Sequence, residues 1–209
     1  MTEATPDIGP LRPAEIASAS RLLATALLAD PGWVHVVPNV QQRELALRAV
    51  TSMALRDSMP FGNVLAARVG GRLAGVAVWQ PPGSYPMTVR RKARTVPAMT
   101  VLAARAPRSI RDLSRFGASL DAVFPTVPVW YLQALGVHPD LQRRGHGHRL
   151  VAPILTAAER SCVGCYLETA EPANIAYYQR LGFSLVAPVG PLYPGGPAMA
   201  RMATRVSTT

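Results

Sequence analysis

The sequence contains only two cysteines, Cys162 and Cys165, with two residues between them. A structural zinc site needs a second cysteine pair or histidines at ligand spacing, and neither follows. A redox pair of the thioredoxin type stands where a strand opens a helix, whereas this pair leads into a predicted strand. We therefore expect no metal site and two buried thiols kept reduced in the cytoplasm.

Long apolar runs and a secretory leader are also missing. No apolar run reaches about 18 residues, the length of a membrane span. The opening stretch, MTEATPDIGP, has neither the basic start nor the apolar core of a signal peptide. These absences predict a cytoplasmic protein without a membrane partner.

Acidic and aromatic residues are scarce. The chain has 12 acidic residues against 22 basic ones, a net charge of +10, and 6% aromatic residues. Its 209 residues, 49% of them hydrophobic, have the composition of a globular domain rather than of a disordered chain. Basic excess favours polyanionic partners. A nucleic-acid-binding face would spread its charge and interleave aromatic residues, so this composition argues against a nucleic-acid partner.

Most of the positive charge lies in one segment bounded by prolines. Between Pro86 and Gly117, eight basic residues accompany the single acid Asp112. We interpret residues 81–128 as an insertion. Its helical periodicity, with a break at Pro107, runs through Val101, Leu102, Ile110, Leu113 and Phe116. We interpret the arginines as a solvated helical face, and the alternative is a lid near an anionic ligand.

Hydrophobic periodicity predicts a mixed order of strands and helices. A helix over 41–57 places Leu45, Ala49 and Met53 on its buried side. The remaining elements are a strand near Leu11 with a helix after Pro13, a hairpin of strands 64–69 and 73–79, strands at 127–137 and 164–170, helices at 143–160 and 172–182, and a final antiparallel pair at 183–189 and 197–205. This order predicts an α/β (α+β) fold, a single domain with a mixed, mostly antiparallel sheet of about six to seven strands flanked by helices.

The stretch HPDLQRRGHGHRL, from His138 to Leu150, places two glycines among three arginines and three histidines. An apolar strand precedes it and a helix follows. The free amides and the dipole of a helix start attract anions, and glycine lets backbone approach them closely. A P-loop would need a Gly-Lys-Ser/Thr ending, and a dinucleotide turn would need glycine where Leu150 stands. The sequence therefore predicts a phosphate-binding turn of another kind.

The pattern Gln142-x-x-Gly145-x-Gly147 after that strand resembles the acetyl-CoA pyrophosphate loop of the GNAT superfamily of N-acetyltransferases. Downstream, LETAEPANIAYYQRLGF resembles the second half of the family, and together with WYLQALGVHPDLQRRGHG it is most similar to the puromycin N-acetyltransferase-like members. The resemblance implies one GNAT-like domain over residues 1–209, with a cofactor-binding half at 129–205. It also implies acetyl-CoA as the co-substrate and direct acetyl transfer to a primary amine.

The resemblance further implies which residues bind the co-substrate. Backbone of the strand would pair with the pantetheine arm, the strand pair would splay near Gly136, and amides of the turn would hold the pyrophosphate. The implied set is Leu135, Gly136, Val137, Gln142, Arg143, Arg144, Gly145, His146, Gly147, His148 and Asn174. The Arg143 and Arg144 side chains either contact phosphate or face solvent. Asn174 is an N-cap, a cofactor contact, or both.

The resemblance also implies catalytic roles. Tyr178, four residues before Gly182, stands where GNAT enzymes place a tyrosine that protonates the departing thiolate. The alternative is a tyrosine packed on the core side, as we expect for Tyr177. Because the strand before the turn carries no acid, Glu168 on the next strand is the candidate general base. A structural carboxylate or an ordered water chain are the alternatives.

The acceptor is expected between the early helices and the insertion. Candidate lining residues are Asp30, Trp33, His35, Trp79 and Tyr85. An acid with aromatic rings suits a cationic amine, although Asp30 and Trp33 could equally cap and pack a helix end. We expect a small-molecule amine substrate and leave a homodimer open. The alternatives are acetylation of a protein, which an open cleft free of the insertion would favour, and a non-catalytic acyl-CoA sensor.

Overall fold

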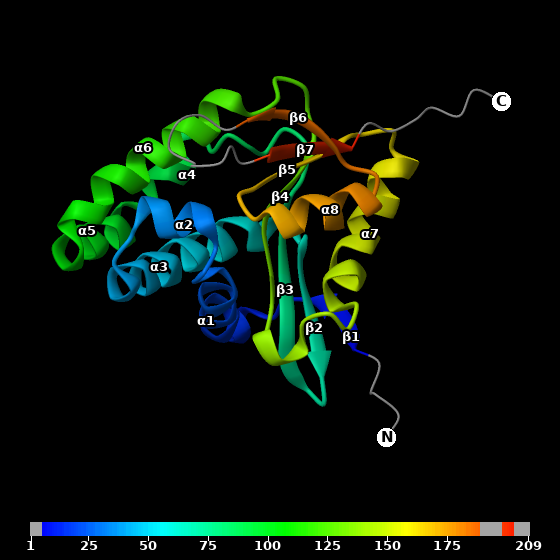
Figure 1. Cartoon of the computed structure of the whole chain (residues 1–209), viewed down its shortest axis with the longest axis horizontal. Coiled ribbons are helices and arrows are strands. Elements are labelled where there is room, and N and C mark those ends of the chain that lie inside the picture. The colour runs from blue at the N-terminus through cyan, green and yellow to red at the C-terminus, as the bar shows by residue number, and fades with distance from the viewer. Residues whose placement is uncertain (1–5, 189–197, 203–209) are drawn as a thin grey trace.

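The computed structural model describes residues 6–188 and 198–202, and within them seven strands form one mixed sheet (Figure 1). The strands are β1 (Asp7–Pro10), β2 (Val64–Val69), β3 (Arg72–Gln80), β4 (Trp130–Val137), β5 (Cys165–Thr169), β6 (Ser184–Pro188) and β7 (Ala198–Met202). Their spatial order is β1-β2-β3-β4-β5-β7-β6, and only the β4–β5 pair is parallel. The predicted mixed, mostly antiparallel sheet is confirmed. Positions 189, 197 and 203–205 of the predicted final strands lie outside the described residues.

Helices cover both faces of this sheet (Figure 1). One face carries α1 (Ile16–Leu27) and α3 (Val40–Ser58), joined by the short α2 (Pro31–Val36), and the other carries α7 (His146–Arg160) and α8 (Pro172–Arg180). Side chains of β3 alternate between the two, since Val76 and Val78 pack with α1 while Trp79 packs with α7. Within the described ranges, no helix combines the length and apolarity needed to cross a bilayer.

Three helices lie between β3 and β4, where the sequence predicts a helical insertion. They are α4 (Val89–Ala93), α5 (Val96–Arg105) and α6 (Pro107–Val123). Pro107 starts α6, as expected of a residue that cannot continue the preceding helix. The rings of Tyr85 and Phe124 flank this segment and pack on Tyr131 of β4, with centroids 4.8 and 5.2 Å away. These contacts hold the insertion over the start of the β4–β5 pair.

The buried face of α3 differs from the sequence prediction. Leu45 is 39% exposed, and Leu45 and Met53 line an open groove. Ala49 also lines this groove, but it packs against a buried core cluster as predicted. The core side carries Arg43, Ala46, Leu47, Thr51, Ala54 and Leu55. Two of these are polar and are buried through hydrogen bonds to backbone carbonyls. Apolar periodicity alone could not identify that face.

Arg43 of α3 links this helix by hydrogen bonds to the chain on both sides of α2. Its Nε donates to the Leu28 carbonyl at 2.7 Å, and its Nη1 donates to the Val37 and Pro38 carbonyls at 2.8 Å each. Arg43→Ala leaves these carbonyls without that donor, so we expect the free energy of unfolding to fall by about 2–4 kcal/mol. Urea denaturation would measure it. Arg21→Ala, at an exposed position, is the control, and an equal loss in both variants would contradict this role.

The two cysteines differ in environment, contrary to the expectation of two buried thiols. Cys165 is buried in β5, and burial raises the pKa of its thiol to about 12. Cys162 is exposed because it stands in the turn after α7, with a left-handed backbone (φ 53°). Across the described ranges, no three His, Cys, Asp or Glu side chains gather closely enough to hold a metal ion.

Candidate active site

Strands β4 and β5 separate soon after they meet. They pair only at Trp130 with Cys165 and at Tyr131 with Tyr166. On its other side, β4 stays paired with β3 as far as Val137. The β5-facing edge of β4 from Leu132 onward therefore has no strand partner in the described part of the chain. The resemblance to GNAT enzymes implies a splay near Gly136, and the pairing ends several residues earlier, at Tyr131.

A groove of about 650 Å³, here called the glycine-turn groove, opens at the end of β4. Ten of the eleven implied co-substrate residues line it: Leu135, Gly136, Val137, Gln142, Arg143, Gly145, His146, Gly147, His148 and Asn174. The eleventh, Arg144, is exposed and lies outside that lining. The fold thus brings the sequence motif to one side of the splayed strands, with α1 and α8 completing the walls.

The start of α7 leaves its amides open. Gly145 is the N-cap and has a left-handed backbone (φ 78°), and no side chain of the described residues caps the helix. The first amide of α7 to bond backward within the helix is that of Arg149, to the Gly145 carbonyl at 3.1 Å. The amides of His146, Gly147 and His148 precede it, so they are free to bind an anion.

Two buried polar atoms beside these amides also lack partners among the described residues. They are His146 Nδ1 and the hydroxyl of Tyr177. That hydroxyl would stand 3.2 Å from a Cβ added at Gly147, so a side chain there would intrude on it. The open amides and the orphaned groups fit a bound pyrophosphate. Tyr177, expected only to pack, therefore belongs to the lining of the groove.

Gly145→Ala is expected to weaken acetyl-CoA binding by roughly tenfold. Alanine in the left-handed region costs about 1–2 kcal/mol, so the turn of the unbound variant adopts another backbone conformation. Binding must then restore the left-handed conformation, and this cost lowers the affinity. Calorimetry with acetyl-CoA would measure the change. Gly62→Ala is the matched control, because Gly62 has the same left-handed backbone (φ 74°) away from the groove. Equal affinities of the two variants would count against this role of the turn.

A second cavity of about 260 Å³, the Glu168 pocket, lies between the splayed strands. Its walls are residues 132–135 of β4, residues 167–169 of β5, the α1–α2 connection and the insertion. Residues shared with the glycine-turn groove are Leu27, Asp30, Leu135, Asn174 and Tyr178. The two cavities therefore meet, and Tyr178 and Asn174 stand where they join.

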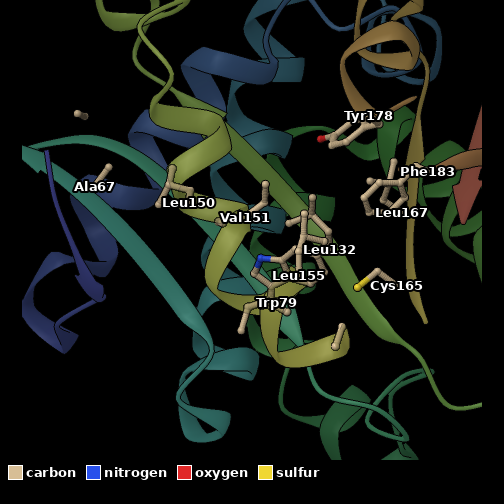
Figure 2. Close-up of a cluster of buried hydrophobic side chains, with 14 residues drawn as sticks. Ala67, Trp79, Leu132, Leu150, Val151, Leu155, Cys165, Leu167, Tyr178 and Phe183 are labelled. Atoms are coloured by element: carbon tan, nitrogen blue, oxygen red, sulfur yellow. The ribbon is translucent and has the colours of Figure 1, made fainter. Parts of the chain in front are cut away.

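Three of the five predicted acceptor residues line the Glu168 pocket, namely Asp30, Trp33 and Tyr85. His35 is exposed on α2. Trp79 is fully buried in the core beside α7 (Figure 2). Neither belongs to the pocket lining, and for Trp79 the reason is the strand pleat, which turns it to the opposite face of the sheet.

Gln80 and Gln133 were not anticipated from the sequence. The β3–β4 register shifts beside Gln133, which points into the Glu168 pocket. Gln80 is fully buried, and its Nε2 donates to Gln133 Oε1 at 3.1 Å and to Asp57 Oδ2 at 3.3 Å. Arg91 of the insertion donates to Gln80 Oε1 at 3.0 Å. A β-bulge that re-aims a side chain is common near active sites, but it leaves little signal in the sequence.

Glu168 is the carboxyl group at the base of this pocket. Its Oε2 accepts a hydrogen bond from the Tyr131 hydroxyl at 2.9 Å, while its Oε1 is buried without a partner. Burial raises the pKa of Glu168 to about 7, although hydrogen bonds from Tyr131 and Tyr166 act in the opposite direction. A carboxyl group with a pKa near neutrality and one free oxygen suits proton abstraction.

Tyr178 packs by its ring and leaves its hydroxyl free. The ring lies 5.7 Å from that of Phe183 between centroids, and its hydroxyl points away from Phe183 and Leu167 (Figure 2). No described residue hydrogen-bonds this hydroxyl. Burial raises the pKa of Tyr178, so the phenol keeps its proton at neutral pH. The ring of Tyr178 thus packs in the core, and the same residue also lines both cavities.

The helix caps near the junction are Asp30 and Glu171. Asp30 Oδ1 accepts from the amides of Gly32 and Trp33 at 3.0 and 3.2 Å, so it caps α2 while also lining both cavities. Glu171 caps α8, which leaves Asn174 inside that helix rather than at its N-cap. Asn174 Nδ2 instead donates to Thr169 Oγ1 at 3.3 Å. The interpretation of Asn174 as an N-cap is therefore wrong.

A family model described as the acetyltransferase (GNAT) family matches residues 38–183. That range contains the splayed strands, the open glycine turn, Glu168 and Tyr178. The chain belongs to the GNAT acetyltransferase family. The resemblance drawn from the sequence is thereby confirmed at the level of the family, and this GNAT chain is an acyltransferase.

Solved structures agree on the fold of this GNAT chain. A protein from Corynebacterium glutamicum described as histone acetyltransferase HPA2 and related acetyltransferase is 21% identical, with a TM-score of 0.72 over 98% of this chain and 99% of its own. Arylalkylamine N-acetyltransferase 2 from Aedes aegypti is 10% identical, with a TM-score of 0.60 over 95% and 99%. The Drosophila melanogaster polyamine N acetyltransferase is 18% identical, with a TM-score of 0.52 over 94% and 97%.

Proposed function

We propose that this GNAT chain transfers acetyl from acetyl-CoA directly to the primary amine of a small molecule. The observation that carries this proposal is the meeting of two cavities at Tyr178. One cavity surrounds the open amides of α7, and the other contains the Glu168 carboxyl group. Together they supply a phosphate anchor, a proton acceptor and a proton donor around one junction.

The proposed reaction uses each of these groups once. The amine nitrogen attacks the thioester carbonyl carbon, and Glu168 accepts the proton that the nitrogen releases. Free amides on the unpaired edge of β4 polarise the carbonyl oxygen. As the carbon–sulfur bond breaks, the Tyr178 hydroxyl donates its proton to sulfur. Leu135, Gly136 and Val137 pair with the pantetheine arm as an added strand would.

A small molecule is favoured over a protein because helices of the insertion form one wall of the acceptor pocket. Residues Met99, Leu113, Phe116 and Leu120 of α5 and α6 wall the Glu168 pocket. A lysine on a folded protein, or a chain N-terminus, would need an open cleft. The volume of about 260 Å³ is at the small end of ligand pockets.

The pocket chemistry favours an amine with an apolar or aromatic body. Aromatic rings of Trp33, Tyr85, Phe116 and Tyr131 line it, and its two carboxyl groups are Asp30 and Glu168. Such a wall attracts one ammonium group and packs against an apolar skeleton. Among the amines named for similar structures, we therefore rank arylalkylamines above polyamines. The puromycin-like subtype, a cytoplasmic location, the lack of a nucleic-acid partner and a homodimer stay predictions.

The test is calorimetry of the purified chain with acetyl-CoA, followed by thiol release across an amine panel. The panel contains 2-phenylethylamine, tryptamine, spermidine, puromycin and a lysine peptide. Binding with turnover on the arylalkylamines is the expected result. Binding without turnover on any amine would favour the acyl-CoA sensor. No binding would overturn the assignment of the glycine-turn groove.

A further inference from the structure

A third cavity of about 490 Å³ lies away from the active site, between α3 and the insertion helices α4 and α5. Figure 1 places α3 and α5 side by side at the end of the molecule opposite α7. We call this cavity the arginine groove. Its lining is Leu45, Arg48, Ala49, Ser52, Met53, Arg56, Asp57, Arg91, Arg94, Thr95, Ala98, Val101, Leu102 and Arg105.

The floor of the arginine groove is apolar and open. Leu45, Ala49 and Met53 follow one another at helical spacing along α3, and Val101 and Leu102 face them from α5. Leu45 is 39% and Val101 is 53% exposed. Leu102 is buried in the core and Ala49 packs against it, so the open part of the floor is formed by Leu45, Met53 and Val101. Exposed apolar side chains gathered in a cavity indicate a binding surface.

The rim of the groove carries more arginine side chains than acidic side chains that could neutralise them. Asp57 is the one acidic residue in the lining, and it forms an ion pair with Arg91. Arg48 pairs with Glu44 beside the groove. In the described part of the chain, no ion pair or hydrogen bond involves the side chains of the other three arginines, which are Arg56, Arg94 and Arg105. Three uncompensated guanidinium groups therefore surround the apolar floor.

We propose that the arginine groove binds a small amphipathic anion, with a phosphate or carboxylate head on the arginines and an apolar body on the α3–α5 floor. Guanidinium groups bind such heads through paired, charge-assisted hydrogen bonds. The volume is that of a small-molecule site. Among the described residues, no aromatic side chain lines the groove, so they provide no stacking platform for a single-stranded nucleic acid there.

The site is separate from the proposed acetyl-transfer chemistry. None of its lining residues belongs to the glycine-turn groove or to the Glu168 pocket. The ligand is therefore an additional molecule, neither acetyl-CoA nor the amine acceptor. Its binding can be measured without turnover, so this proposal and the proposed function fail independently.

Octyl phosphate is the probe for this site. Two partial probes serve as controls: 1-octanol lacks the charge, and inorganic phosphate lacks the apolar body. Calorimetry on the full chain would be run with saturating coenzyme A, which keeps phosphate probes out of the glycine turn. We expect octyl phosphate to bind at least tenfold more tightly than either partial probe. Binding of octyl phosphate no tighter than that of inorganic phosphate would overturn the apolar half of the proposal.

Two double variants then localise the site. Arg94→Ala with Arg105→Ala removes two rim arginines, and Arg111→Ala with Arg115→Ala removes the same charge from exposed positions on α6. We expect the first pair to weaken octyl phosphate at least tenfold and the second to leave it unchanged. Equal weakening would reveal a non-specific charge effect, and no change in the first pair would place the probe elsewhere. Either result would overturn the proposal. Thermal melts confirm that both variants fold.

Discussion

Replacing Tyr178 with phenylalanine is expected to lower kcat for acetyl transfer by roughly 10²–10⁴-fold, the usual contribution of a positioned acid. The variant removes only the hydroxyl, and the ring packing with Phe183 is unchanged. Acetyl-CoA affinity should stay within about twofold of wild type, since the open amides of α7 provide the anchor. Steady-state kinetics with calorimetry on the same preparation would separate the two effects.

Tyr177→Phe is the matched control for this experiment. The two tyrosines are neighbours in α8, and both line the glycine-turn groove, but only Tyr178 also lines the Glu168 pocket. Loss of the Tyr177 hydroxyl should raise the KM for acetyl-CoA and leave kcat nearly unchanged. If Tyr177→Phe lost kcat and Tyr178→Phe retained it, the proton donor would be the neighbour rather than Tyr178.

Replacing Glu168 with glutamine is expected to remove a pH-dependent part of the rate. Burial raises the pKa of Glu168 to about 7, so the carboxyl group is protonated below neutrality and becomes a base above it. The ratio of wild-type to variant kcat/KM should rise through about pH 7 and reach at least about 10²-fold on the alkaline side. Taking the ratio cancels the titration of the amine substrate itself. A ratio independent of pH would point to a structural carboxylate or a water chain.

Tyr131→Phe tests the role of Glu168 by removing its hydrogen-bond donor. The hydrogen bond from the Tyr131 hydroxyl lowers the pKa of Glu168, so its loss should move the midpoint of the rate profile to higher pH.

The pH dependence of folding stability gives a second test of Glu168. A carboxyl group whose pKa is raised on folding stabilises the fold below its unfolded pKa and loses that contribution as pH rises through about 7. Glu168→Gln should remove that loss, which is up to about 3 kcal/mol.

The half of the molecule that holds the glycine turn was predictable because its signals are local. A strand, a glycine turn and a helix start stand within a few residues of one another, and one chain segment positions all the open amides. The interest of Tyr178, four residues before Gly182, came from the resemblance to GNAT enzymes in the same stretch of chain. The open glycine turn and the order of the elements could therefore be predicted from the sequence.

The acceptor side was less predictable because distant segments build it. The sequence predicts Trp79 in the pocket, yet the strand pleat turns it into the core. Gln133 enters the pocket through a register shift, and Gln80 beneath it is held by Asp57 and Arg91 from two other helices. The helical spacing of Leu45 predicts a core position, but Arg43 and Thr51 occupy the core face through hydrogen bonds to carbonyls. Hydrogen bonds between polar groups that are distant in the sequence leave no local pattern from which they could be predicted.

The separation of β4 from β5 after Tyr131 leaves an empty strand position inside the sheet. Backbone groups along that edge of β4 lack a strand partner in the described chain, so the folded state forgoes hydrogen bonds that a continuous sheet would make. A molecule that fills the gap acts as a missing structural element as well as a reactant. Ligand at 100 times its Kd adds about 2.7 kcal/mol to the folded state. The resistance of the protein to heat and proteases should therefore follow the supply of its own co-substrate.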